Sequence, residues 1–318
     1  MKEVFGTSSV VEEARLSARQ RAGEGRTPGQ NCIIVILITL LIYFIAQTIM
    51  SFAMGGYLAF DIMSTTDVTQ DFTFELGWDS LMSPGMILVM LFSEIVIVIA
   101  YIIYIKAFEK RKVTSIGFVK KRAVPSYLIG IAGGAAFMII DALICKLAGA
   151  MTFEPSGISV FKIVLFAGGW MIQGLAEEVM CRGFLLTSIA RRNSVTLAVI
   201  LNSALFAVLH VFNPSGMNVL AMLNLFLFGV FASLLFLRSG NIWLCAGLHS
   251  AWNMVQGNVL GIPVSGINVD SVYSSAADSG MTIVNGGSFG LEGGIVVTVM
   301  LMVSCAVLMF WSKGHNRQ

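Results

Sequence analysis

Two adjacent glutamates and an arginine lie in the otherwise apolar stretch GLAEEVMCRGFLL at 174–186. On a helix, Glu178 and Arg182 are four positions apart and share one face, where they can form an ion pair. Glu177 is turned by about 100° from Glu178, so we expect it to be unpaired and to face a cavity. The alternative interpretation is a buried structural network, which suits Glu178 and Arg182 better than it suits Glu177.

Two of the three histidines lie in other apolar stretches. His210 ends the sequence FAVLH, one helical turn after Phe206, and His249 opens HSAWN, one turn before Asn253. The helical rise places these groups and Glu177 about 12–24 Å from the ends of their helices, so they can meet in one layer. A lone histidine in an apolar helix is usually a packing residue, but this combination favours a functional site.

These residue types can hydrolyse an amide bond. A carboxylate beside an imidazole can take a proton from water, while a second imidazole and an amide can donate hydrogen bonds to the developing oxyanion. Glu177, His210 and His249 are also suitable zinc ligands, so the cofactor is either one divalent metal such as zinc or none. No HExxH zinc motif or GxGD motif is present.

The composition surrounding these residues is that of a membrane protein. Only 12% of the residues are charged and 56% are hydrophobic, whereas soluble domains carry about 25% charged residues. The net charge of +2 and the absence of a basic stripe give no indication of a nucleic-acid partner. Apolar runs long enough to cross a bilayer predict an all-α polytopic bundle of about eight transmembrane helices, near 32–54, 85–107, 127–149, 160–190, 195–212, 217–237, 241–261 and 291–312.

The charges between these runs indicate the orientation. Alternate loops are basic. The intervening loops hold acidic residues, such as Asp67 and Asp270, and no lysine or arginine. The positive-inside rule therefore predicts that both termini are cytoplasmic in a multi-pass protein of the cell (plasma) membrane. The basic residues on which this depends are Arg15, Arg19, Arg21, Arg26, Lys110, Arg111, Lys112, Lys120, Lys121, Arg122, Arg191, Arg192, Arg238, Lys313 and Arg317.

The chain divides into five predicted parts. These are a cytoplasmic tail (1–31), N-terminal transmembrane helices (32–150), a catalytic core (158–262), an external loop (263–290) and a last transmembrane helix with its tail (291–318). The external loop is rich in Gly, Ser and Asn, and we expect it to be mobile. Glu94, Asp141 and Lys146 are isolated in the N-terminal helices, and we assign them structural or snorkelling roles.

Three motifs in the core, in this order and spacing, resemble those of a known family. EEVMCR at 177–182 is similar to the EExxxR motif of the CAAX protease and bacteriocin-processing (CPBP, or Abi) family, which includes the type II CAAX prenyl endopeptidases. FAVLH at 206–210 resembles its FxxxH motif, and HSAWN at 249–253 its HxxxN motif. SFGLEGG at 288–294 resembles a segment that precedes the last helix in bacterial members.

The resemblance implies an intramembrane endopeptidase that acts on a peptide or lipidated peptide within the lipid bilayer. It implies that Glu177 and His210 activate water, that His249 and Asn253 stabilise the oxyanion, and that Glu178 and Arg182 support them. Two alternatives stay open: a non-catalytic immunity or scaffold protein of the membrane, and a transporter, since polar groups at mid-membrane also suit ion coupling.

Overall fold

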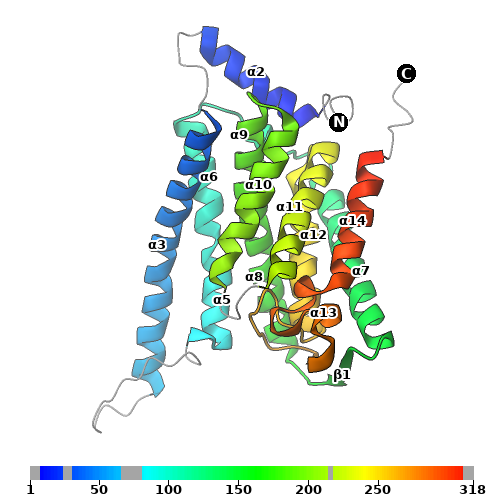
Figure 1. The fold of residues 1–318 in the computed structure, drawn as a ribbon. Helices are drawn as coiled ribbons and strands as arrows, with labels where there is room; N and C mark the ends of the chain where they lie inside the picture. Colours follow the sequence, from blue (N-terminus) through cyan, green and yellow to red (C-terminus); the bar gives the residue numbers. More distant parts are fainter. Residues whose placement is uncertain (1–7, 24–30, 66–80, 214–217, 311–318) are drawn as a thin grey trace.

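The computed structural model describes residues 8–23, 31–65, 81–213 and 218–310. Long helices run side by side, α2 crosses one end of the bundle, and a two-stranded sheet and α13 lie at the other end (Figure 1). The tail after Phe310 and several orientation residues, including Asp67, Lys313 and Arg317, lie outside the described residues. The elements are α2 Ser9–Gly23, α3 Cys32–Thr65, α5 Pro84–Ser93, α6 Ile95–Ala107, α7 Ala123–Leu147, β1 Met151–Pro155, α8 Val160–Glu178, a π-helix Val179–Leu186, α9 Thr187–Ala190, α10 Val195–Leu209, α11 Val219–Ser239, α12 Ile242–Met254, β2 Tyr273–Ala277, α13 Thr282–Asn285 and α14 Ile295–Phe310.

Helices occupy the described parts of all eight ranges predicted to span the membrane. In the described part of the chain, six helical runs have the length and composition of a span: 32–64, 84–107, 123–147, 160–190, 195–212 and 219–239. The other two are not among these six: α12 has 13 residues and continues into a π-helix at Val255–Val259, and α14 has 16 residues up to Phe310, where the described part of the chain ends. An all-α membrane bundle is therefore confirmed, and the count of eight spans and the position of the termini stay predictions.

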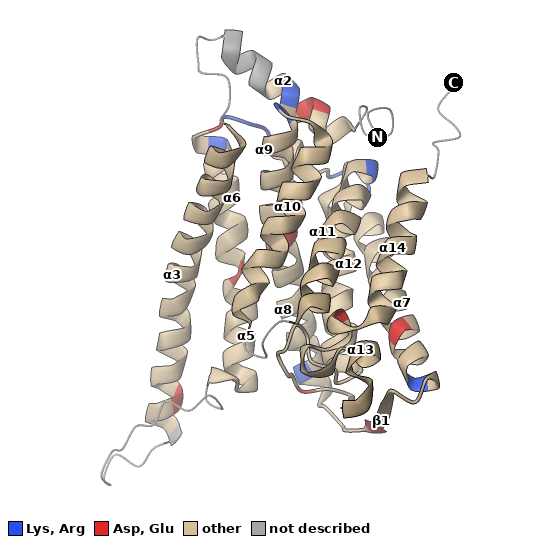
Figure 2. Cartoon of the chain, in the orientation of Figure 1, with Lys and Arg blue, Asp and Glu red and all other residues tan. Residues whose placement is uncertain are grey.

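Charged side chains follow this arrangement. Lysine and arginine lie mainly near the two ends of the bundle, whereas several acidic residues lie between the ends (Figure 2). The basic loops around 110–122, 191–192 and 238 lie at the end covered by α2, because α2 contacts the turn at 113–116, α9 and α11. On the outer face, α3 exposes large apolar side chains such as Phe44 and Phe52, as a helix in contact with lipid would.

Side-chain caps fix where the helices of the core begin. Ser159 accepts a hydrogen bond at the start of α8, Ser194 at the start of α10, Asn218 at the start of α11 and Asn241 at the start of α12. Each cap satisfies a backbone N–H that has no partner within its helix. Because the starts are fixed, the depth of each side chain further along is fixed as well.

The helical run that carries the acidic pair changes its winding where the pair ends. A π-helix follows directly after Glu178 and ends at Leu186, and such segments often occur at functional sites. Gly174 lies where α8 packs against α12. A Cβ atom at this position would lie 2.7 Å from the Ser250 Oγ and 2.8 Å from the Ser250 backbone nitrogen. The missing side chain therefore lets α8 approach α12, which brings the glutamates close to His249.

The segment predicted to be a mobile external loop is instead folded, and that prediction was wrong. Its strand β2 pairs antiparallel with β1, with Met151 opposite Ala277. Asn258 donates a hydrogen bond to the Asp270 backbone oxygen, and Val264 forms a bridge with Ile267. Backbone groups that composition alone would leave to solvent are thus paired within the protein.

Candidate active site

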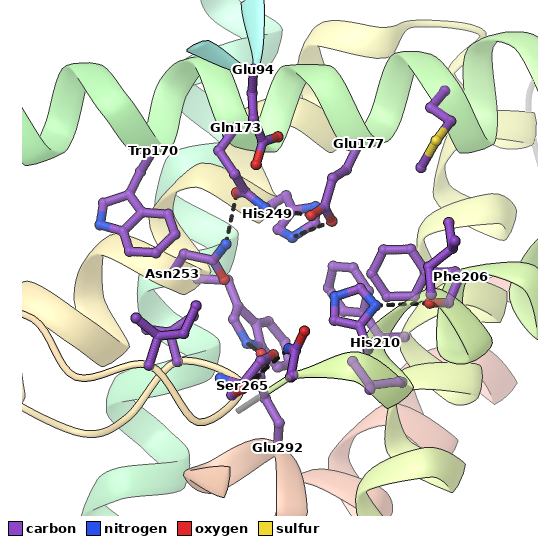
Figure 3. Close-up of a pocket in the computed structure, with 18 of the residues that line it drawn as sticks. Glu94, Trp170, Gln173, Glu177, Phe206, His210, His249, Asn253, Ser265 and Glu292 are labelled. Atoms are coloured by element: carbon purple, nitrogen blue, oxygen red, sulfur yellow. Dashed lines mark hydrogen bonds and ion pairs between the residues drawn. The ribbon is translucent and has the colours of Figure 1, made fainter. Parts of the chain in front are cut away.

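A cavity of about 180 Å³ lies inside the bundle, between α3, α5, α6, α8, α10, α11, α12 and α14. Its lining includes the four residues that the sequence expected to converge: Glu177 from α8, His210 at the end of α10, and His249 and Asn253 from α12. Figure 3 shows these side chains around one space. Three segments that are distant in the sequence therefore bring an acid, two imidazoles and an amide to one cavity.

The predicted ion pair between Glu178 and Arg182 is present. The Arg182 Nη1 lies 2.8 Å from the Glu178 Oε1, and both side chains are fully buried. The guanidinium also lies over two aromatic rings, 4.8 Å from the Phe206 centroid and 5.5 Å from the Phe228 centroid. The Arg182 Nε and Nη2 have no hydrogen-bond partner in the described structure, so burying the guanidinium costs free energy. The cation–π contacts with the two rings offset part of that cost.

Glu177 is not unpaired, which corrects the expectation from the sequence. Its Oε1 accepts a hydrogen bond of 2.6 Å from the Gln173 Nε2. Gln173 lies one turn earlier on α8, so the two side chains share a face. The Glu177 Oε2 lies 3.6 Å from the His249 Nε2. This separation is longer than a hydrogen bond, and the Oε2 has no hydrogen-bond partner in the described structure.

His249 stands between the two glutamates. Its Nδ1 lies 3.0 Å from the Glu178 Oε1, the atom that also accepts from Arg182. A carboxylate that is already paired with a guanidinium can only accept, so the His249 Nδ1 carries a proton. The other ring nitrogen then points toward Glu177 and the cavity. Arg182, Glu178 and His249 therefore form a chain that fixes the orientation of the imidazole.

His210 is oriented by the backbone. It begins the short 3₁₀ turn that ends α10, and its Nδ1 lies 2.8 Å from the Phe206 carbonyl oxygen. Because a carbonyl only accepts, the Nδ1 carries the proton and the Nε2 presents a lone pair. The rings of Phe206 and His210 are in contact, with centroids 4.6 Å apart, so the imidazole is also held by packing. His210 thus offers one accepting nitrogen to the cavity.

Asn253 reaches Glu177 through Gln173. The Asn253 Nδ2 donates a 2.9 Å hydrogen bond to the Gln173 Oε1, while the Gln173 Nε2 donates to Glu177. One of the two N–H groups of the Asn253 amide is therefore committed and the second is left for another acceptor. Asn253 is only 3% exposed, so this second donor can act in a region shielded from bulk water.

The sequence left open whether Glu177, His210 and His249 bind a metal. Within the described residues, no group of three His, Cys, Asp or Glu side chains is arranged to hold a metal ion. The described structure therefore holds no three-ligand zinc site.

Several residues that line the cavity were not identified from the sequence as part of a site. Gln173 could have been found, since it lies one turn before Glu177 on the same helical face. Glu94 was assigned a structural role, yet it lines the cavity where α5 gives way to α6, and its Oε2 has no hydrogen-bond partner. Asp141 lies outside this lining, buried beside Cys145.

Glu292 is a further acid in the cavity wall, supplied by the short turn Leu291–Gly293. It accepts hydrogen bonds from the Trp252 Nε1 at 3.2 Å and from the Ser265 backbone nitrogen and Oγ, each at 2.7 Å. Burial raises the pKa of the Glu292 carboxyl above its ordinary value, although the donors from Ser265 counteract this. No local pattern links this turn to the helices opposite.

The comparisons with known proteins agree with the motifs. Residues 159–255 match the family model described as type II CAAX prenyl endopeptidase Rce1-like. The matched range contains α8, α10, α11 and α12, and with them all three motifs. The resemblance inferred from the sequence is therefore confirmed over this range. Among curated proteins and among solved structures, no match was found.

Proposed function

Because its core matches the Rce1-like type II CAAX prenyl endopeptidases, we propose that this chain is an intramembrane endopeptidase that hydrolyses a peptide bond in the cavity. The observation that carries the proposal is the convergence of Glu177, His210, His249 and Asn253 on one cavity. The substrate is a peptide or lipidated peptide that approaches from the bilayer.

Glu177 acts as the general base. Gln173 holds its Oε1, which leaves the Oε2 facing the cavity. The carboxylate takes a proton from water as the water oxygen attacks the carbonyl carbon of the peptide, and later passes this proton to the departing amine. The lone pair on the His210 Nε2 accepts the second proton of the same water in a hydrogen bond, which orients the water for attack.

His249 and Asn253 stabilise the oxyanion that forms on the carbonyl oxygen. Asn253 uses the N–H that Gln173 leaves free, and His249 uses its Nε2. To donate through both nitrogens the imidazole must carry two protons. Glu178 at 3.0 Å and Glu177 at 3.6 Å together balance this charge and that of Arg182, which pairs with Glu178. Donors that are already oriented in a site of low dielectric are the main source of rate enhancement in reactions of this kind.

The test is cleavage of quenched fluorescent peptides, with and without a lipid group, by the purified protein in lipid nanodiscs. We expect the wild type to cleave and Glu177→Gln to lose about 10²- to 10⁴-fold in rate, the usual contribution of a general base. Because no three-ligand cluster is formed in the described residues, a metal chelator should leave the rate unchanged.

Asp141→Asn is the matched control, since Asp141 is a fully buried acid of the bundle that does not line the cavity. It should cleave like the wild type. Cleavage by Glu177→Gln at the wild-type rate would contradict the proposed role. If no peptide is cleaved while Glu177→Ala still confers resistance to a bacteriocin, the chain is a non-catalytic immunity or scaffold protein. Loss of activity with chelator would mean that the ligands rearrange around a metal.

A further inference from the structure

Acidic side chains outnumber cationic ones in the wall of the cavity. Glu94, Glu177 and Glu292 all line it, from three different parts of the chain, whereas no lysine or arginine does among the described lining residues. The charge of Arg182 lies nearby but is paired with Glu178. An occupant of this cavity therefore meets three carboxyl groups, two imidazoles and neutral side chains.

Two of these acids have no part in the proposed hydrolysis. Glu292 is held by three neutral donors on Trp252 and Ser265, and no salt bridge to it is present in the described structure. These donors hold the Glu292 carboxyl group in one position on the wall, and no opposite charge is paired with it in the described structure. Glu94 lies across the cavity from Glu292 (Figure 3), and its buried Oε2 has no hydrogen-bond partner. Burying an acidic side chain at either position costs free energy while the cavity is empty. A bound group that donates a hydrogen bond or carries a positive charge would lower this cost.

The acids are also arranged for a molecule larger than a metal ion. They do not gather into a three-ligand metal site in the part of the chain described. A cavity of about 180 Å³ has room for about six waters at roughly 30 Å³ each, or for one long side chain. Trp170, Trp252 and Tyr43 also line it and offer aromatic surface to an aliphatic stem and to a cation.

We propose that the cavity selects a peptide segment with a cationic side chain, which Glu94 and Glu292 recognise. The inference rests on the proposed endopeptidase function and names the substrate class of that same site. A lysine or arginine side chain would place its stem against the aromatic residues and its charge between the two carboxylates. By the same physics a free C-terminal carboxylate at this position is disfavoured, because it would be desolvated next to Glu94 and Glu292.

Binding can be measured without turnover in the His210→Gln variant, which keeps all three carboxyl groups. The probes are otherwise identical peptides that carry lysine, norleucine or glutamate at one position, scanned along the sequence. We expect the lysine peptide to bind about tenfold more tightly than the norleucine peptide at one position, equivalent to about 1.4 kcal/mol. Adding Glu292→Gln or Glu94→Gln should remove this preference and leave the affinity for the norleucine peptide unchanged.

Asp141→Asn in the same background is the control and should keep the preference for lysine. Because Glu94 and Glu292 lie on different elements, either variant tests the inference if the other fails to fold. Equal binding of lysine and norleucine peptides at every position would overturn the inference, as would a preference for glutamate or for a free C-terminal carboxylate. If the lysine peptide binds selectively but the wild type cleaves no peptide, only the endopeptidase function is refuted. If the wild type cleaves peptides but shows no preference for lysine, only the present inference is refuted.

Discussion

Replacing Arg182 by alanine should destabilise the protein far more than replacing Glu177 by alanine. Arg182 and Glu178 are fully buried and 2.8 Å apart, so removing the cation leaves an uncompensated charge in a low dielectric. Breaking a buried pair in this way costs about 3–5 kcal/mol. The lost contacts of the guanidinium with Phe206 and Phe228 act in the same direction. Glu177 is 18% exposed and bonded to a neutral amide, so its removal strands no opposite charge.

The assay is thermal unfolding of the purified variants in one detergent, followed by tryptophan fluorescence. At about 2–4 °C per kcal/mol, Arg182→Ala should lower the apparent melting temperature by on the order of 10 °C relative to the wild type. Glu177→Ala should lower it by only a few degrees. Lower expression of Arg182→Ala than of Glu177→Ala should accompany this difference.

A double variant separates charge from packing. Glu178→Gln combined with Arg182→Met removes both charges and keeps most of the volume, and buried pairs replaced in this way are often close to neutral in stability. We expect it to recover most of the loss seen in Arg182→Ala. Equal melting temperatures for Arg182→Ala and Glu177→Ala, or a double variant that is no better than Arg182→Ala alone, would refute the reasoning.

Two further predictions concern how α8 presents the glutamates. Gln173→Leu removes the donor that holds Glu177. Since a hydrogen bond to a charged group contributes about 1.5–3 kcal/mol, kcat should fall by about tenfold or more, and the melting temperature should fall by several degrees because Glu177 and Asn253 both lose a buried partner; an unchanged kcat would contradict this role. Gly174→Ala places a Cβ atom 2.7–2.8 Å from Ser250, so α8 must move away from α12, and both the melting temperature and the cleavage rate should fall. Gly133→Ala is its control, because the nearest atom there is 3.9 Å away, and matching behaviour of the two alanine variants would show that the close approach is unimportant.

The features that were predictable from the sequence are those set by one helix at a time. The spacing of four between Glu178 and Arg182 gives their ion pair directly, because residues four apart share a face. The same rule brings the rings of Phe206 and His210 into contact. The roles of these residues in hydrolysis stay predictions, and the match of residues 159–255 supports only the family resemblance.

The partner of Glu177 shows where such reasoning stops. Both Gln173 and Cys181 lie four positions away from it on the helix, and only the structure shows that the amide makes the contact. The folding of the external loop (263–290) was missed for a related reason. Its strand pairs with Met151–Pro155, more than one hundred residues earlier, and a Gly- and Ser-rich composition does not indicate which distant segment a strand will pair with.

The sequence by itself determined the membrane class, the helices and the face on which each polar side chain lies, because helical periodicity is a local property. Only the tertiary structure decided that Glu94 and Glu292 share a cavity with the motif residues, and that His249 stands between two glutamates. Contacts between helices depend on close packing at positions such as Gly174 and on the path of distant segments, and neither is encoded in the spacing within one helix.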